Sequence, residues 1–439
     1  MTLSASFLSS KLADLEAVAG KPSRYVVAFS GGLDSTVLLH ALAGSEVATL
    51  AVHVDHGLQA DAALWDRHCS QVAADVGVNY RSLRVDVALD SGKGPEASAR
   101  EARYRALRSE MQPGDWLLSA HHHEDQAETV LLNLVRGSGP AGIAGIGELR
   151  RFPPGWLVRP LLEIERKSLL DYAESNKLAW VEDPSNEDRR FDRNFLRHDV
   201  LPLLGSRWPD VASRLNRSAR HARESWQLLQ DLAAIDLAAL GGRAERLPVD
   251  GLLNLSFVRQ QNLLRHALLQ LGLPTPGEAQ INRILDEVLP AREDAQPLVQ
   301  WCGAEVRRYR GALHLLPERL AVTPGSLSTR GADIALGGGL GTLVFDEDAD
   351  CGLSPDLLGR GLRLAFRAGG EVIKPFGHAH TRKLKKLLQD EGVVPWMRDR
   401  LPLLYAGDDL VAVGDLWLAD AAVTKPGVAL RWIDRPALH

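Results

Sequence analysis

Cysteine is scarce in this sequence. Cys69, Cys302 and Cys351 are the three cysteines among 439 residues. Their odd number, wide spacing and lack of any CxxC pair exclude a disulfide framework and a zinc knuckle. Such cysteines fit a reducing compartment, so we expect a cytoplasmic protein.

Long apolar runs and an excess of positive charge are also missing. No stretch of 18 apolar residues occurs, and the first 20 residues lack the apolar segment of a secretory signal, so we expect a protein that is neither exported nor membrane-spanning. The 51 lysines and arginines are outnumbered by 56 acidic residues, which gives a formal net charge of −5. A polyanionic partner must therefore meet local basic patches.

The composition that remains is that of a globular protein with several domains. The chain is 45% hydrophobic and 24% charged, and 439 residues are too many for one hydrophobic core. We predict a catalytic domain over 1–210, a mostly helical domain over 211–320 and a C-terminal domain over 321–439.

Apolar, β-branched segments alternate with segments of helical spacing in the first part of the chain. Strands are predicted at Tyr25–Phe29, Val47–Val54, Tyr80–Val85, Trp116–Ala120 and Trp156–Val158, and helices at Thr36–Leu42, Thr129–Val135 and Arg166–Ser175. This alternation is typical of an α/β fold with a parallel sheet, in which ligands bind at the carboxyl ends of the strands.

The second half of the chain has a different pattern. Helical spacing at Val211–Leu240, Ser256–Leu271 and Gly277–Leu289 predicts a helical domain. A Gly-, Ser- and Thr-rich stretch over 322–341 indicates a linker. Short apolar runs over 343–439 predict a small α+β or mostly β domain at the end of the chain.

A glycine-rich loop between the first strand and the first helix is the sharpest chemical signal. It reads Ser30, Gly31, Gly32, Leu33, Asp34 and Ser35. Glycines let the backbone approach an anion, amides at a helix start can hold phosphate oxygens, and Asp34 can reach a phosphate-bound Mg²⁺ ion. The alternative is a plain glycine turn with a helix cap. The loop resembles the PP-loop of ATP pyrophosphatases, which cleave ATP between the α and β phosphates and adenylate an oxygen of their substrate.

A histidine-rich segment follows the fourth predicted strand. Three consecutive histidines, 121–123, do not suit zinc, because neighbouring side chains point in different directions and no cysteine or matched histidine completes the ligands. A helix that begins near Asp125 puts Asp125 and Glu128 on one face, toward the phosphate loop. The alternative is an acidic helix start that complements the helix dipole.

Several motifs across residues 25–202 together resemble the signature of the tRNA(Ile)-lysidine synthetases. They are His121-His122-x-x-Asp125-Gln126-x-Glu128-Thr129, Arg136-Gly137-Ser138-Gly139, His53-Val54-Asp55-His56-Gly57-Leu58, Glu96 with Ala99-Arg100 and Arg103-Tyr104, Arg159-Pro160-Leu161-Leu162, Asp183-Pro184-Ser185-Asn186, Arg193-Asn194 and Arg197-His198. One departure is Ile146, which stands where the family pattern has methionine; we expect it to alter packing only.

The resemblance implies a two-step ligation. ATP adenylates the C2 oxygen of the wobble cytosine in a tRNA(Ile) with a CAU anticodon, and pyrophosphate leaves. The ε-amine of free L-lysine then attacks C2 and displaces AMP. ATP, Mg²⁺, L-lysine and this tRNA are therefore the expected ligands.

We assign expected roles to residues of the two motifs on this basis. Residues Ser30–Ser35 bind ATP, and Asp34 brings Mg²⁺ to the departing pyrophosphate. His121 acts as a base or a cation at the α-phosphate. Asp125 and Glu128 are the natural partners of the lysine ammonium groups, and Arg193 contacts a phosphate or the nucleotide.

Two basic runs stand against the acidic balance. Arginines at 189, 190, 193 and 197 crowd the end of the first predicted domain, although nearby acids make a self-paired loop an alternative. The second run has five positive charges and no acid, and is either a tRNA-binding segment or a solvated helix face; its charges are Lys374, Arg382, Lys383, Lys385 and Lys386. Leu364–Trp417 resembles the C-terminal domain of longer lysidine synthetases, which implies a grip on the acceptor end of the tRNA.

Three rival functions are less well supported. A tRNA thiolase of the PP-loop class needs paired cysteines or a cluster, which the three cysteines do not supply. A small-molecule amide synthetase would not explain the basic third domain, and a nucleotide-sensing adaptor would not need Asp125 and Glu128. Oligomeric state, domain orientation, adenine contacts and the rejection of elongator tRNA(Met) stay open.

Overall fold

The computed structural model describes residues 3–56, 62–85, 95–292, 295–318, 328–329 and 332–438. The motif residues Gly57 and Leu58, the side chain of Glu96 and part of the predicted linker at 322–341 lie outside the described residues. The chain divides into two compact units, Met1–Leu229 and Gln230–His439. The predicted division into three domains is finer and stays a prediction. No helix in the described ranges has the length and apolar character needed to cross a membrane.

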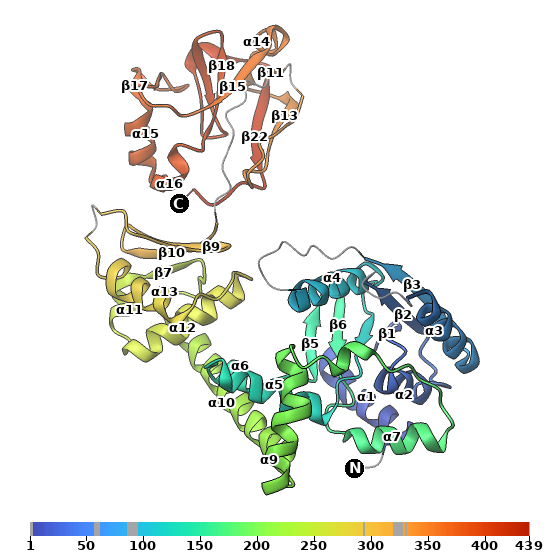
Figure 1. Ribbon diagram of the computed structural model, residues 1–439. Helices are drawn as coiled ribbons and strands as arrows, with labels where there is room; N and C mark the ends of the chain where they lie inside the picture. The colour runs from blue at the N-terminus through green and yellow to red at the C-terminus, as the bar shows by residue number, and fades with distance from the viewer. Residues whose placement is uncertain are drawn as a thin grey trace. The chain divides into compact units, whose positions relative to one another are not determined.

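A six-stranded sheet in the order β3-β2-β1-β4-β6-β5 organises the first unit (Figure 1). Its strands are β1 (Tyr25–Ala28), β2 (Thr49–Asp55), β3 (Asn79–Arg84), β4 (Trp116–Leu118), β5 (Leu149–Phe152) and β6 (Gly155–Val158). All pairings are parallel except that of β5 with β6. The predicted parallel sheet is confirmed, and the antiparallel edge strand β5 is an addition that the apolar pattern did not indicate.

Helices cover both faces of this sheet because alternate strand residues point to opposite sides. Tyr25 and Val27 pack with α1 (Ala5–Ala19), α2 (Leu33–Ala41), α3 (Ala62–Val76) and α7 (Arg166–Ser175). Val26 packs on the other face with α4 (Pro95–Ser109). Both faces are therefore dry, which explains the nearly continuous apolar runs of β1 and β4.

The remaining helices of the first unit follow β4 and β6. They are α5 (His123–Val135), α6 (Pro140–Ile143), α8 (Asp192–Phe195), α9 (Leu201–Arg207) and the start of α10 (Val211–Ala239), with single turns at Pro184–Glu187 and Leu196–Val200. Helix α2 begins where β1 ends, and α5 begins shortly after β4 ends. Since β1 and β4 are adjacent and parallel, the starts of α2 and α5 meet at one edge of the sheet.

The second unit begins with helices packed on a small sheet. The helices are α11 (Val249–Leu253), α12 (Phe257–Gln270) and α13 (Glu278–Arg283) with a π turn at Ile284–Val288, and the strands are β7 (Arg246–Pro248), β8 (Leu298–Trp301), β9 (Ala304–Tyr309) and β10 (Ala312–Pro317). The predicted helices are confirmed. The antiparallel sheet β7-β10-β9-β8 was not predicted, because its β9–β10 turn uses Arg310 and Gly311, both at positive φ, where Asn-Gly is the usual signal.

Short strands dominate the last part of the second unit. The strands are β11 (Ser328–Thr329), β12 (Ile334–Ala335), β13 (Thr342–Ala349), β14 (Gly352–Leu353), β15 (Leu362–Phe366), β16 (Val372–Ile373), β17 (Arg382–Lys383), β18 (Pro402–Ala406), β19 (Asp409–Val413), β20 (Trp417–Leu418), β21 (Val423–Thr424) and β22 (Gly427–Ile433). They form two five-stranded sheets and one two-stranded sheet. Three short helices, α14 (Pro355–Arg360), α15 (Leu384–Glu391) and α16 (Pro395–Arg398), and a 3-10 turn at Asp420–Ala422 accompany them. The predicted α+β or mostly β character is confirmed.

Candidate functional site

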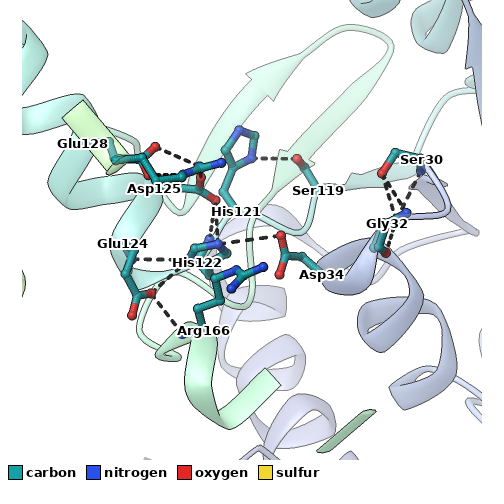
Figure 2. Close-up of polar contacts among 12 residues, drawn as sticks. Ser30, Gly32, Asp34, Ser119, His121, His122, Glu124, Asp125, Glu128 and Arg166 are labelled. Atoms are coloured by element: carbon teal, nitrogen blue, oxygen red, sulfur yellow. Dashed lines mark hydrogen bonds and ion pairs between the residues drawn. The ribbon is translucent and has the colours of Figure 1, made fainter. Parts of the chain in front are cut away.

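The glycine-rich loop forms the N-terminal end of α2. Its hydroxyls brace the turn: the Ser30 amide donates to Ser35 Oγ at 3.2 Å, and Ser35 Oγ donates to the Gly32 carbonyl at 3.1 Å (Figure 2). The amides of Leu33, Asp34 and Ser35 open the helix and have no intrahelical acceptor. The loop therefore offers backbone N–H groups and a positive helix end to an anion.

Gly31 is required for this loop shape. Its φ is +77°, and a Cβ atom there would lie 2.6 Å from Cys69 Sγ. Gly32 has an ordinary φ of −76°, and a Cβ there would meet ordinary contacts. The tight turn thus depends on the first glycine of the pair, and Cys69 is buried beneath it as a packing residue.

Asp34 faces the start of α5 with one oxygen unsatisfied. Its Oδ2 lies 3.6 Å from His122 Nε2, and its buried Oδ1 has no hydrogen-bond partner. Burial raises the pKa of Asp34, and the nearby His122 opposes this shift. An unsatisfied carboxylate oxygen beside a phosphate loop suits a hard cation.

His122 links the two halves of the site. The side chain is 2% exposed; its Nδ1 lies 3.0 Å from Glu124 Oε2 and its Nε2 lies 3.6 Å from both Asp34 and Asp125 (Figure 2). Burial disfavours the charged ring, but Asp125, Glu124 and Asp34 together raise the pKa of His122 above its usual value. The imidazolium form is thus favoured between the loop and α5.

Asp125 and Glu128 lie on one face of α5, as the spacing predicted, and two arginines bind them. Glu128, 1% exposed, accepts from Arg193 Nε at 2.8 Å and from Arg197 Nε at 2.6 Å. Asp125 Oδ1 lies 3.0 Å from the Arg193 guanidinium and 3.2 Å from that of Arg197. Burial opposes ionisation of Asp125, yet His122 and Arg193 hold the pKa of this carboxyl far below its usual range.

Asp125 also orders the start of its own helix. Its Oδ2 accepts from the backbone N–H of His122, the residue that caps α5, at 3.0 Å. This is one half of a capping box. The predicted alternative, an acidic helix start, therefore describes the same carboxylate that contacts the arginines.

His121 lies at the end of the loop that follows β4. Its Nδ1 is 2.7 Å from Ser119 Oγ. Burial lowers the pKa of His121 to about 3; Asp125 opposes this shift, and the surrounding Arg159, Arg193 and Arg100 add to it. A neutral, hydrogen-bonding ring fits this environment and a cation does not, and the low pKa makes His121 a weak base.

The structure divides the first basic run into two groups. Arg189 and Arg190 form ion pairs with Asp199 and Asp188 at 2.7 Å each, as the self-paired alternative expected. Arg193 and Arg197 turn instead toward α5. Two residues, Phe191 and Asp192, thus separate the arginines of a solvent-exposed turn from those of the candidate site.

The second basic run is divided in a similar way. Lys374 pairs with Asp420 at 2.8 Å, and Arg382 pairs with Asp390. Lys383, Lys385 and Lys386 are exposed and form no ion pair with a described residue. These three lysines line a shallow cavity of about 250 Å³, together with Gln389 and Asp390 further along α15.

Two members of the site were not assigned a role from the sequence. His122 and Arg197 belong to the quoted motifs, but the expected roles were given to His121 and Arg193 instead. A capping box, with His122 three residues before Asp125, could have indicated His122. Helical spacing from Arg193 to Arg197 could have indicated the second arginine. Ile146 bonds through its backbone, to both amide atoms of Gln126, which agrees with a packing role.

The residues present fit Mg²⁺ only together with a phosphate ligand. No group of three or more His, Cys, Asp or Glu side chains in the described part of the chain could hold a metal ion. Asp34 alone offers a free carboxylate oxygen at the loop. Mg²⁺ is commonly held by one or two carboxylates, substrate phosphates and waters, so a single aspartate at a phosphate loop is sufficient.

Comparisons with known proteins agree with this geometry. Residues 6–204 match the family model of a PP-loop domain, residues 247–314 that of the TilS substrate binding domain, and residues 362–432 that of the TilS substrate C-terminal domain. The chain is 44% identical over 422 residues to the tRNA(Ile)-lysidine synthase of Alkalilimnicola ehrlichii, with 94% of each chain covered. It is 40% identical over 397 residues to that of Coxiella burnetii, covering 89% of this chain and 88% of the other. A solved structure, the U34-tRNA thiolase NcsA from Methanococcus maripaludis, matches with a TM-score of 0.41 and 19% identity over 50% of this chain and 80% of that chain.

Proposed function

Because this chain belongs to the tRNA(Ile)-lysidine synthase family and is an ATP-dependent ligase, we propose that it joins L-lysine to C2 of the wobble cytidine in a tRNA(Ile) with a CAU anticodon. ATP is the adenylating substrate, and AMP and pyrophosphate are the other products. The unpaired cysteines support a cytoplasmic setting. The observation that carries this proposal is the meeting of the phosphate loop with Asp125 and Glu128 at one edge of the sheet.

The loop amides and Asp34 act in the adenylation step. The amides of α2 hold the polyphosphate, and the C2 oxygen of cytosine attacks the α-phosphorus as the bond to pyrophosphate breaks. Mg²⁺ would be held by Asp34 and supplies charge stabilisation for the departing pyrophosphate. Asp34 is suited to this because its unsatisfied oxygen costs free energy until a cation reaches it.

The two carboxylates act in the lysine step. A lysine substrate brings two ammonium groups, and Asp125 and Glu128 are two buried carboxylates on one face of α5. Both already bind Arg193 and Arg197, so an incoming ammonium takes the place of a guanidinium group. The displaced guanidinium can bind phosphate oxygens of the adenylate, for which its planar fork is well suited.

The attacking amine must lose its proton before it adds to C2. Asp125 and Glu128 orient the ε-amine, and one of them takes its proton once the ammonium group has displaced the guanidinium groups. His121, kept neutral by burial, accepts a hydrogen bond. The nitrogen then forms a bond to C2 while the bond from C2 to the AMP oxygen breaks. His122, in its charged form, attracts both Asp34 and Asp125 and keeps the two carboxylates beside it.

The direct test is a labelling assay with a matched set of amine donors. Radiolabelled lysine, ATP and unmodified tRNA(Ile) with a CAU anticodon are incubated with the protein, and lysine incorporation and AMP release are counted. Equimolar AMP and tRNA-bound lysine are expected, with no incorporation from glutamine, ammonia or a sulfur donor. AMP release that accompanies one of those donors instead would overturn the proposal.

A further inference from the structure

A second cationic cavity lies at the other end of α15, within the unit Gln230–His439. Its volume is about 530 Å³, within the range of roughly 300–1,000 Å³ that is typical of ligand sites. Three arginines, Arg243, Arg246 and Arg310, line it together with Tyr309, His314 and Glu391. Neither the catalytic edge of the first unit nor the basic run at 374–386 includes these arginines.

Three segments that are distant in sequence build this cavity. Arg246 on β7 lies opposite His314 on β10 in the sheet register, Tyr309 ends β9, and Arg310 lies in the β9–β10 turn. Glu391 ends α15. Contacts between the segments hold the walls in place: Arg310 donates to the Gln389 carbonyl at 3.0 Å, and Arg398 donates to Tyr309 Oη at 3.1 Å.

Ring packing against Trp396 supports two residues that line the cavity, Tyr309 and His314. The His314 and Trp396 ring centroids are 5.0 Å apart, and those of Tyr309 and Trp396 are 6.0 Å apart. The Arg310 guanidinium lies over the Tyr309 ring, 5.4 Å from its centroid. The cavity therefore has a preorganised aromatic and guanidinium wall, which is the kind of surface on which nucleic-acid bases stack.

The charges of the cavity favour an anion. Arg243 forms an ion pair with Glu245 at 2.9 Å, whereas Arg246 and Arg310 form no ion pair with a described residue. Glu391 is the acid that lines the cavity, so three guanidinium groups face one carboxylate. Burial, and next Arg246, lower the pKa of His314 to about 4, so this ring adds a hydrogen-bonding group and no charge near neutral pH.

We propose that this cavity is a subsite for one unstacked nucleotide of the tRNA, whose phosphate binds Arg243, Arg246 and Arg310. Guanidinium groups bind phosphate oxygens in pairs, and a concave cavity admits a splayed nucleotide but not a duplex. On the same helix, Lys386 lies five residues and Lys383 eight residues before Glu391, which is roughly 8–12 Å along the helix axis. One RNA strand can therefore contact both ends of the helix.

The proposed subsite depends on the proposed function, in which tRNA is the substrate. The test distinguishes failure of the subsite from failure of that function. The Kd of the full-length protein for unmodified tRNA(Ile) with a CAU anticodon is measured by filter binding over a series of KCl concentrations. The variants are R246Q, R246Q/R310Q and E391Q, with R283Q as the matched control. Arg283, the last residue of α13, is an exposed arginine of the same unit that pairs with Glu287 of the following π turn.

The double variant is expected to raise Kd about tenfold and to reduce the slope of log Kd against log salt by roughly 1 to 2, since each lost phosphate contact removes about 0.7 to 0.9. R246Q alone should show about half of this change in slope and an unaltered Tm, because the Arg246 side chain forms no hydrogen bond or ion pair with a described residue. E391Q should lower Kd about twofold, and R283Q should leave both quantities as in the wild type.

An unchanged Kd and slope in R246Q and R246Q/R310Q would overturn the subsite. If the wild-type protein still transfers labelled lysine to the tRNA in that case, the subsite alone is wrong. If the wild-type protein transfers no lysine, the proposed function is wrong. A loss of tRNA affinity in R246Q/R310Q without a change in slope would also contradict the subsite, since misfolding or lost packing produces that result.

Discussion

Buried charges at the edge of the first sheet neutralise one another, whereas the charges on α15 do not. Asp125 and Glu128 are almost fully covered and bind Arg193 and Arg197. The exposed lysines at the start of α15 form no ion pair with a described residue. Buried pairs need partners because desolvation is costly, while exposed cations cost little and stay available to a polyanion.

This difference in charge pairing indicates that the two regions contribute to different steps. Paired charges at fixed distances position reacting groups, so changes there should alter kcat and stability. Unpaired surface charges add an attraction that depends on salt, so changes there should alter tRNA affinity. The net charge of −5 averages over both regions and hides this division.

Asp34→Asn should cause the largest loss. We expect kcat for lysine transfer to fall by at least about 10³-fold, because Asn cannot carry the charge that a cation at the loop requires. Stability should hold or rise above pH 5, since the buried carboxylate of Asp34 has a raised pKa and its ionised form destabilises the fold. Lysine-transfer kinetics and thermal melting measure both effects; a variant with normal kcat would contradict the role.

Glu128→Gln should come next, with combined losses. Removal of the charge leaves Arg193 and Arg197 short of a partner. Breaking a buried pair costs roughly 3–5 kcal/mol, and we expect about 2–3 here because both guanidinium groups stay partly exposed. The lysine KM should rise at least about tenfold while the tRNA Kd stays constant. Steady-state kinetics with denaturant unfolding test this, with Glu187→Gln, an exposed acid on the 183–188 turn, as the control.

Lys383→Glu with Lys386→Glu should have a moderate effect of another kind. The tRNA KM should rise about tenfold at low salt, with little change in kcat, because each reversed charge weakens attraction to phosphate. Lys374→Glu is the matched comparison and should have a smaller effect, since Lys374 already pairs with Asp420. Equal KM values in the wild type and the double variant would remove α15 from the tRNA surface.

The pH dependence of stability should be the smallest effect. His122 has a raised pKa in the folded protein, so its contribution is complete below its unfolded pKa near 6.5 and is lost as pH rises through the folded value. Wild-type stability should therefore decline over that window relative to His122→Gln. Thermal melting of both proteins from pH 6 to 9 checks this; parallel curves would show that His122 does not titrate there.

Local patterns predicted much of the first unit. Apolar or alternating segments marked β1, β2, β3 and β4, and the glycine pair marked the start of α2, because these signals depend on neighbouring residues. The spacing of Asp125 and Glu128 correctly placed both on one face of α5. The spacing did not identify their partners, since Arg193 and Arg197 lie about 65 residues further along the chain.

The second unit was harder to predict for a related reason. Its β7–β10 sheet has strands of three to six residues and a turn of Arg310 and Gly311, so neither length nor turn composition stood out. The basic run at 374–386 was visible as five charges. Only the folded chain shows that Asp420 and Asp390 neutralise Lys374 and Arg382 and leave three lysines free of acidic partners among the described residues.

Steady-state kinetics of two variants test most directly whether the two regions act in different steps. Lysine transfer to tRNA(Ile) with a CAU anticodon is measured for E128Q and for K383E/K386E, with lysine and tRNA varied in turn. The account predicts that E128Q raises the lysine KM and leaves the tRNA KM unchanged. It predicts that K383E/K386E raises the tRNA KM and leaves the lysine KM unchanged. Both variants raising the same KM would contradict it.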